Sequence, residues 1–139
     1  MGDITDLANT IYGEGASTDY NTMKMIGSSI INRVSSGRAK EFGSSIPEVA
    51  QKGYYAVSNP NVPYKQAIAG KFPDKASETA YKQALAVASG LIKGTIQPDK
   101  VHFYFTDKEI NKLKKNPKRF DFKRVKPTGE VGQYKLFSY

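Results

Sequence analysis

Glu14 is the residue whose surroundings in the sequence most favour catalytic chemistry. It lies between Gly13 and Gly15, just after a helical pattern of apolar residues that ends at Ile11. The C-terminus of a helix carries partial negative charge, which raises the pKa of a carboxyl group there, and Ile11 and Tyr12 would add desolvation. A carboxylic acid that stays protonated near neutral pH is what general-acid cleavage of a glycosidic bond requires. The alternative is an exposed glutamate in a turn.

Several side chains could bind a sugar polymer beside this acid. Gly13 and Gly15 would let such a chain approach the backbone closely. Aromatic rings match the apolar faces of sugar rings, and an amide can hydrogen-bond to an acetamido group. The substrate-binding candidates are Tyr12, Tyr54, Tyr55, Asn59, His102 and Tyr104. The alternatives are a place in the core for the tyrosines, a strand position for the histidine and an ordinary Asn-Pro turn for the asparagine.

The sequence excludes several other kinds of site. It has no cysteine and a single histidine, His102. A disulfide framework, a thiolate metal site and a cysteine nucleophile are therefore ruled out, as is a site built from several histidines. We expect neither a metal ion nor an organic cofactor.

Length and composition are typical of one globular domain. The chain has 139 residues, of which 39% are hydrophobic and 12% aromatic. This length suits a single domain, here residues 1–139, and this aromatic content argues against disorder. No apolar run approaches the ~18 residues of a membrane span. We expect a soluble monomer.

Positive charge is concentrated at the C-terminal end. The formal net charge is +8, and residues 100–139 carry 11 basic and 4 acidic side chains, mostly within residues 108–126. Such a field favours polyanions, namely nucleic acid, an anionic membrane or an anionic cell-wall polymer. A solvated basic face without a specific partner is the alternative.

The hydrophobic pattern predicts helices first and a small antiparallel sheet after them, which is an α+β fold. We expect an irregular segment over residues 53–72, because prolines and glycines interrupt it. We also expect three residues to support the site structurally. Asn32 would hold the Glu14 loop by hydrogen bonds, and Gly13 and Gly15 would shape that loop. The expected helices cover residues 3–13, 19–35, 45–50, 75–93 and 107–115, and the expected strands cover 101–105, 122–126 and 134–137.

Two blocks in the first quarter of the chain carry a resemblance to a known family. Residues 10–15 read Thr-Ile-Tyr-Gly-Glu-Gly, and residues 26–34 read Ile-Gly-Ser-Ser-Ile-Ile-Asn-Arg-Val. They resemble the opening signature of the spore-cortex-lytic, cell-wall-hydrolase family, in which Ile-Tyr-Gly-Glu-Ala precedes a buried helix ending in Asn-Arg-Val. Weaker similarity continues through residues 54–57, 75–93, 102–105 and 131–137.

The resemblance implies a mainly helical, lysozyme-like fold that cleaves peptidoglycan between N-acetylmuramic acid and N-acetylglucosamine. Glu14 would be the catalytic acid, and family members that act as lytic transglycosylases leave a 1,6-anhydromuramic end. The chain departs from the family at Gly15, where alanine is usual, and at Tyr134, near the place of a closing histidine. Any role of that histidine is therefore in doubt here.

The carboxylates favour transglycosylation over hydrolysis. Two-carboxylate hydrolysis needs a second acid about 5–9.5 Å from the first, and Asp19, Glu41 and Glu48 stand in no motif that would fix them opposite Glu14. In the single-acid mechanism Glu14 protonates the leaving oxygen, and as a carboxylate it then deprotonates the 6-hydroxyl that attacks the anomeric carbon. A hydrolytic muramidase and a non-catalytic domain that binds nucleic acid or another polyanion are the alternatives.

The expected partners follow from this function. They are peptidoglycan glycan strands and, through residues 108–126, anionic wall polymers; we expect no nucleic acid, since no recognition motif for it is present. The sequence starts without the basic and apolar stretches of a signal peptide. We therefore expect a phage-type lysin, a virion component, or the excised catalytic domain of an exported enzyme that acts on the cell wall.

Overall fold

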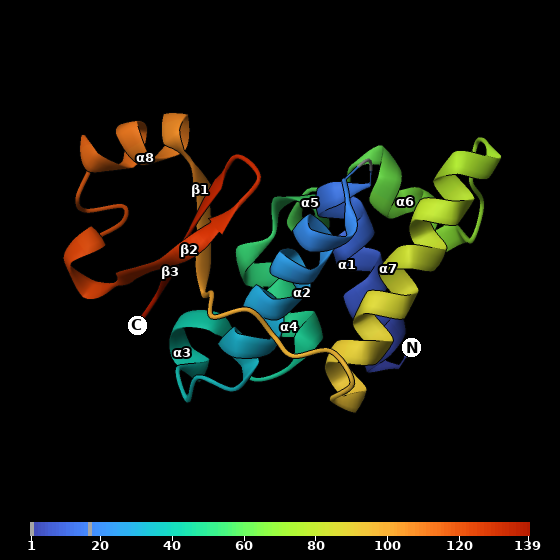
Figure 1. Ribbon diagram of the computed structural model, residues 1–139, viewed down its shortest axis with the longest axis horizontal. Helices are drawn as coiled ribbons and strands as arrows, with labels where there is room; N and C mark the ends of the chain where they lie inside the picture. Colours follow the sequence, from blue (N-terminus) through green and yellow to red (C-terminus); the bar gives the residue numbers. More distant parts are fainter. Residues whose placement is uncertain (1, 17) are drawn as a thin grey trace.

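The computed structural model describes residues 2–16 and 18–139. Ser17, part of the expected start of the second helix, lies outside the described residues. The chain folds into a helical body and a smaller lobe that contains the β-sheet and one helix (Figure 1). The fold is α+β, mainly helical with a three-stranded antiparallel sheet, as the sequence predicts.

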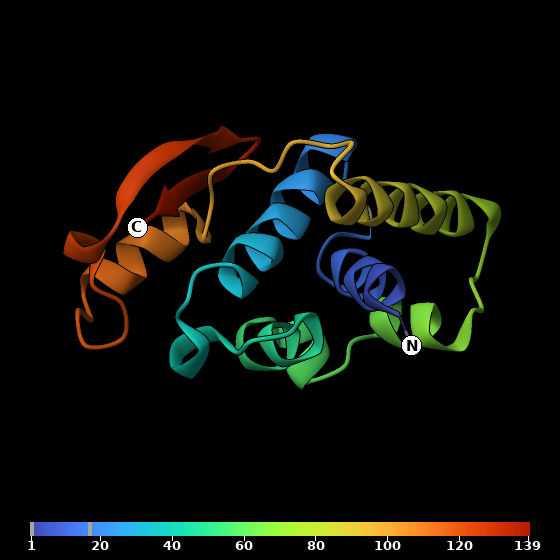
Figure 2. The ribbon, with the colours of Figure 1, turned by 90° about the horizontal axis from the view of Figure 1, so that it is seen from below.

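Seven helices build the body, and α1, α2 and α7 are the longest. The side chains of α1, α2, α4 and α7 form its buried core, which includes Leu7, Ile11, Met23, Ile30 and Val87. Figure 2 shows α1 and α7 running side by side across the body. The helices are α1 (Asp3–Gly15), α2 (Tyr20–Val34), α3 (Ala39–Phe42), α4 (Ile46–Gly53), α5 (Tyr55–Ser58), α6 (Val62–Ala69) and α7 (Lys75–Lys93).

Capping side chains set where these helices begin. Asp19 accepts a hydrogen bond from the Thr22 backbone N–H at the start of α2 (2.9 Å), and Asp74 does the same for Ser77 at the start of α7 (2.8 Å). Each satisfies a backbone donor that the helix leaves free. Helix α7 spans the predicted residues 75–93, so capping and periodicity identified it correctly.

The prediction of an irregular segment over residues 53–72 is wrong. The short helices α5 and α6 lie in it, and α3 was not expected either. Asn61 caps α6, and Pro63 occupies its first turn, where a missing N–H costs no hydrogen bond. The proline was therefore part of a helix start and not an interruption.

The smaller lobe consists of β1 (Phe103–Thr106), α8 (Asp107–Lys114), a 3-10 turn (Phe122–Arg124), β2 (Lys126–Val131) and β3 (Tyr134–Ser138). The strand order is β1-β3-β2, and both pairings are antiparallel. The strand expected over residues 122–126 is wrong, because Phe122–Arg124 forms the 3-10 turn and β2 starts only at Lys126. The turn between β2 and β3 contains Gly132, whose φ of 56° favours glycine.

A segment without regular structure crosses from the end of α7 to β1 along α2 (Figures 1 and 2). The Asn32 amide donates to the carbonyl oxygens of Asp99 and Val101 at 2.8 Å each. The expectation that Asn32 holds the Glu14 loop is therefore wrong: it anchors the chain where it enters the sheet.

Candidate active site

Glu14 lies in the last turn of α1, where its side chain is only partly exposed. The backbone N–H of Ala56, in the first turn of α5, donates to Glu14 Oε1 at 3.2 Å. Among the described residues, no hydrogen bond reaches the second carboxyl oxygen, Oε2. An N–H donor favours an unprotonated oxygen, so a proton on this carboxyl group belongs on Oε2.

Burial raises the pKa of Glu14 above its ordinary value of 4.5. The hydrogen bond from Ala56 and the positive charge of Arg33 act in the opposite direction, and burial outweighs them. The sequence predicts this raised pKa.

The end of α1 is held by α6 and by close packing. The Asn61 side chain donates to the Gly13 carbonyl oxygen at 2.8 Å, while its own oxygen caps α6 by accepting from the Tyr64 N–H at 2.9 Å. A Cβ atom at Gly13 would come within 3.0 Å of the Tyr64 Cβ. Gly13 therefore lets α1 and α6 touch, and Asn61 fixes their relative position.

The expectation that the two glycines open the backbone to a ligand is wrong. Both Gly13 and Gly15 are buried. A Cβ atom at Gly15 would lie 2.7 Å from Thr18 Oγ1 and 2.9 Å from Ile26 Cδ1. The glycines support the site by allowing tight internal packing around Glu14.

Two of the expected substrate-binding tyrosines are core residues. Tyr12 is 2% exposed and Tyr54 is 3% exposed. The Tyr12 ring packs edge-to-face on Phe72 and Tyr81, at centroid distances of 5.5 and 5.6 Å. The Tyr54 hydroxyl forms a hydrogen bond with Ser29 Oγ inside the body. Neither ring can stack on a sugar.

Tyr55 and Asn59 lie on the surface next to the Glu14 contact. Tyr55 is 74% exposed and directly precedes Ala56. The Asn59 amide donates to the Tyr55 hydroxyl at 2.6 Å, which restrains the exposed ring. The pair is therefore exposed to solvent on the helix whose first turn donates to Glu14.

Tyr104 faces the helical body from β1. It packs against the core, with its ring edge-to-face on Tyr134 at 5.4 Å. Burial raises the pKa of Tyr104 well above its ordinary value, and negative charge on Tyr54 or Glu14 adds to the shift. Tyr104 therefore stays a neutral hydroxyl, and it lies close enough to Glu14 for the carboxylate charge to raise its pKa.

The structure does not bring His102 to this site. Its Nδ1 forms a 2.7 Å hydrogen bond with Ser138 Oγ, and its ring packs on Phe42 and Tyr139. Burial lowers the pKa of His102, the charges of Arg33 and Arg38 lower it further, and the charge of Glu41 acts in the opposite direction. The expected role of His102 in substrate binding is thus replaced by a role in packing.

Arg33 is the functional residue that sequence reasoning missed. Its Nε donates to the His102 carbonyl oxygen at 2.8 Å, and its guanidinium group lies about 5 Å from the ring centres of Phe42, Tyr54 and Phe103. Among the described residues, no carboxylate forms an ion pair with it. Its place in the Asn-Arg-Val block could have drawn attention to Arg33. The spacing of residues alone could not show where its side chain points.

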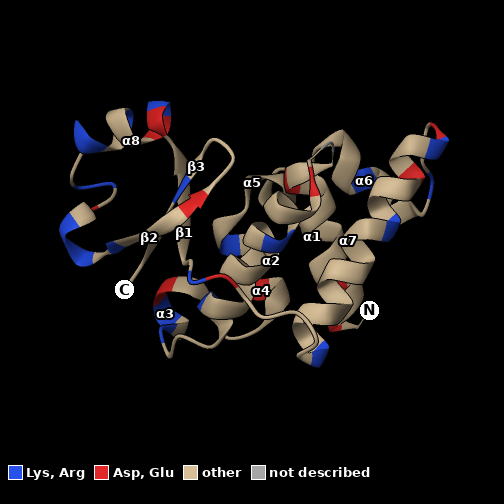
Figure 3. Cartoon of the chain, in the orientation of Figure 1, with Lys and Arg blue, Asp and Glu red and all other residues tan. Residues whose placement is uncertain are grey.

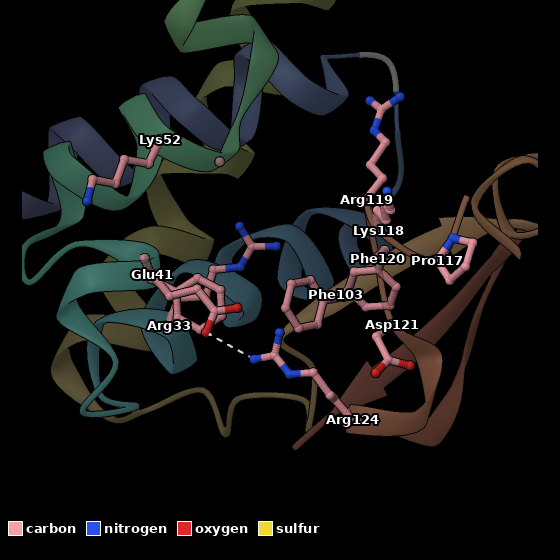
Figure 4. A pocket seen from close by; sticks show the side chains of 12 residues that line it. Arg33, Glu41, Lys52, Phe103, Pro117, Lys118, Arg119, Phe120, Asp121 and Arg124 are labelled. Atoms are coloured by element: carbon pink, nitrogen blue, oxygen red, sulfur yellow. Dashed lines mark hydrogen bonds and ion pairs between the residues drawn. The ribbon is translucent and has the colours of Figure 1, made fainter. Parts of the chain in front are cut away.

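A hollow of about 300 Å³ separates the body from the smaller lobe. Arg33, Gly53, Phe103, Phe120 and Arg124 are among its lining residues, and we call it the interlobe hollow (Figure 4). A second hollow of about 620 Å³ adjoins it, because both are lined by Lys52, Gly53, Arg119 and Phe120. Glu14 lines neither hollow, but Arg33, which lines the interlobe hollow, is close enough to lower the pKa of Glu14 by its charge.

The described residues contain no group of three or more His, Cys, Asp or Glu side chains that could hold a metal ion. None of the helices in residues 2–16 and 18–139 combines the length and apolar character needed to span a membrane. No family model matches the sequence, and no curated protein or solved structure matches it. Function must therefore be argued from the residues and their geometry.

Proposed function

We propose that this protein cleaves the glycan strand of peptidoglycan between N-acetylmuramic acid and N-acetylglucosamine, with Glu14 as the catalytic acid on a lysozyme-like fold. The observation that carries the proposal is the partly buried Glu14 carboxyl group, whose pKa burial raises. A group of this kind delivers a proton to a glycosidic oxygen near neutral pH.

The hydrogen bonding of Glu14 supports a two-step role. Because the Ala56 N–H occupies Oε1, the proton of the acid form sits on Oε2 and is donated to the leaving oxygen. The resulting carboxylate is stabilised by the same N–H and by the charge of Arg33. It then takes the proton of the muramic 6-hydroxyl, whose oxygen attacks the anomeric carbon and closes the 1,6-anhydro ring.

The other acids considered for a second catalytic group already have structural partners. Asp19 caps α2. The Glu48 carboxylate accepts hydrogen bonds from the hydroxyl groups of Ser44 and Ser45 at the start of α4. Glu41 accepts a hydrogen bond from Tyr139 and pairs with Arg38 and Arg124. These carboxylates are therefore held by cap and ion-pair partners of their own, which favours the single-acid transglycosylase over a two-carboxylate muramidase.

Surface residues around Glu14 supply contacts for the sugar. The exposed Tyr55 ring offers an apolar plane, and Asn59 offers an amide beside it. Tyr104 offers a neutral hydroxyl from the opposite lobe. The proposed strand therefore contacts α5 on one side and β1 on the other.

The basic segment at residues 108–126 suits a cell-wall partner. Its side chains give the smaller lobe a positive surface around α8 and the following loop (Figure 3). We assign it an accessory role, in which it attracts anionic wall polymers by long-range electrostatics. The site of action proposed here is the cell wall.

Product masses test the proposal. Purified peptidoglycan sacculi are incubated with the protein, and the released fragments are measured by mass spectrometry. Transglycosylation gives muramic ends about one water lighter than the hydrolysed ends of a muramidase. Fragments with hydrolysed ends would show that the protein is a muramidase and not a single-acid transglycosylase. The absence of any glycan cleavage would refute the proposed function.

A further inference from the structure

The interlobe hollow contains positive charge that the proposed cleavage does not need. Arg33 and Arg124 extend into it from α2 and from the 3-10 turn, and Lys118 and Arg119 border it (Figure 4). The two acids that line it already have partners: Glu41 interacts with Arg38, Tyr139 and one nitrogen of Arg124, and Asp121 accepts from the Lys123 N–H. The hollow therefore has a net excess of cationic donors.

Arg33 is prepared to bind an anion. The rings of Phe42, Tyr54 and Phe103 surround its guanidinium group at about 5 Å. Gly53 lets that group lie against the backbone, since a Cβ atom there would be 2.3 Å from Nη1. A guanidinium group held in this way loses little conformational entropy when its free N–H donors bind a carboxylate or phosphate.

The hollow is also close to the acid. Gly53 borders the hollow and Ala56 donates to Glu14, and three residues of chain span at most about 11 Å. The charge of Arg33 reaches Glu14 as well. A group attached to a strand bound at Glu14 would therefore reach the hollow.

We propose that the interlobe hollow binds the free carboxylates of a short acidic peptide carried by the glycan strand, with Arg33, Arg119 and Arg124 as the principal donors. This inference rests on the proposed function, since it takes the strand at Glu14 as the carrier of the peptide. The protein would thereby prefer peptide-bearing strands to bare ones.

The walls favour a peptide over a phosphate polymer. Phe42, Phe103, Pro117 and Phe120 provide apolar surface between the cations. A short peptide presents methyl and methylene groups together with carboxylates, which matches this mixture. A phosphodiester chain is charged along its whole length and would leave the rings unused.

Direct binding tests the inference without cleavage. The full-length Glu14→Gln variant is titrated calorimetrically with muramyl-tetrapeptide that has free carboxylates, with the same compound as carboxamides, and with poly(glycerol phosphate). We expect the free carboxylate form to bind at least about tenfold more tightly than the amidated form, because charged hydrogen bonds are the stronger ones. Equal affinities, tighter binding of the phosphate polymer, or no binding would overturn the inference.

Matched variants locate the binding. Replacing the exposed pair Lys118 and Arg119 by alanine should weaken binding of the free carboxylate form about fivefold or more. The control replaces Lys71 and Lys93, two exposed lysines of the helical body, and removes the same charge. An equal loss in both double variants would show non-specific attraction and refute a site in the hollow.

Cleavage of bare strands separates the two proposals. Peptide-free glycan strands lack the ligand of the hollow but keep the bond that Glu14 acts on. If the wild type cleaves them while no carboxylate-dependent binding is found, the hollow inference fails and the proposed function remains. If binding is found but neither bare nor peptide-bearing strands are cleaved, the proposed function fails.

Discussion

The Glu14 carboxyl group is subject to two opposing influences. Burial favours its neutral form, whereas the Ala56 N–H and the charge of Arg33 favour its ionised form. An acid that must first give up a proton and later take one up uses both influences, since each stabilises one of the two forms. The Ala56 N–H stabilises the carboxylate form of Glu14, and burial stabilises the protonated form.

The raised pKa of Glu14 makes stability depend on pH. As the pH rises through 4.5, Glu14 ionises in the unfolded chain before it ionises in the folded protein. The unfolded state is then favoured. The free energy of unfolding therefore falls as the pH rises from 4.5 to the folded-state pKa of Glu14, and it stays lower above that pKa. Glutamine cannot ionise, and Glu14→Gln should therefore gain stability relative to the wild type as the pH rises from about 4 to 7.

Urea unfolding of both proteins at several pH values measures this difference. Glu78→Gln serves as control, since Glu78 is an exposed residue of α7. A difference between wild type and Glu14→Gln that stays constant from pH 4 to 7 would contradict the raised pKa.

The sequence predicted a raised pKa for Glu14 from its place at a helix end and from its apolar neighbours, and in the structure burial is the cause of the rise. It did not separate Tyr54 from Tyr55. Adjacent residues point in different directions, and only the packing of α5 against the body shows that the first is buried and the second exposed. The direction of the Arg33 side chain could not be predicted either, because it too depends on how the elements pack.

At the scale of elements, the site depends on short helices that hold the end of α1. Helix α5 presents an N–H to Glu14, and α6 is tied to Gly13 through Asn61. Long helices such as α7 could be predicted from periodicity. The short helices α3, α5 and α6 were not predicted, because tertiary contacts stabilise them more than their own sequence does.

Asn61→Asp tests this arrangement. Aspartate still caps α6, but it has no N–H to donate to the Gly13 carbonyl oxygen, and its charge repels that oxygen. We expect a loss of about 1 kcal/mol in the free energy of unfolding, the usual net value of a hydrogen bond, together with slower glycan cleavage as the end of α1 shifts.

Urea unfolding and a cleavage assay with sacculi measure the two effects. Asn111→Asp on α8 introduces the same charge at an exposed position and is the control. If Asn61→Asp behaved like this control in both measurements, Asn61 would have no part in positioning Glu14.

At the scale of the whole molecule, the excess positive charge and the proposed catalytic acid lie in different lobes. The acid belongs to the helical body, whereas most of the excess positive charge lies around α8 and the following loop (Figure 3). The composition revealed this asymmetry directly. The interlobe hollow could not be predicted, because its walls come from segments far apart in the sequence and depend on how the lobes pack.

Attraction to an anionic wall predicts binding that depends on salt. The Glu14→Gln variant, which should not cleave its substrate, should bind sacculi less tightly as the sodium chloride concentration rises from about 0.05 to 0.5 M. Salt screening shortens the range of charge interactions. Co-sedimentation with sacculi measures the bound fraction. Binding that does not change over this range would show that the basic segment is not used for attraction.

The most direct test of the central claim is the rate at which sacculi gain new chain ends with wild type and with Glu14→Gln. The matched control is Glu48→Gln, an exposed glutamate at the start of α4. We predict that Glu14→Gln loses at least about 100-fold in rate, as expected for removal of a general acid, while Glu48→Gln stays within about twofold of the wild type. A Glu14→Gln protein that is folded and cleaves as fast as the wild type would contradict the account.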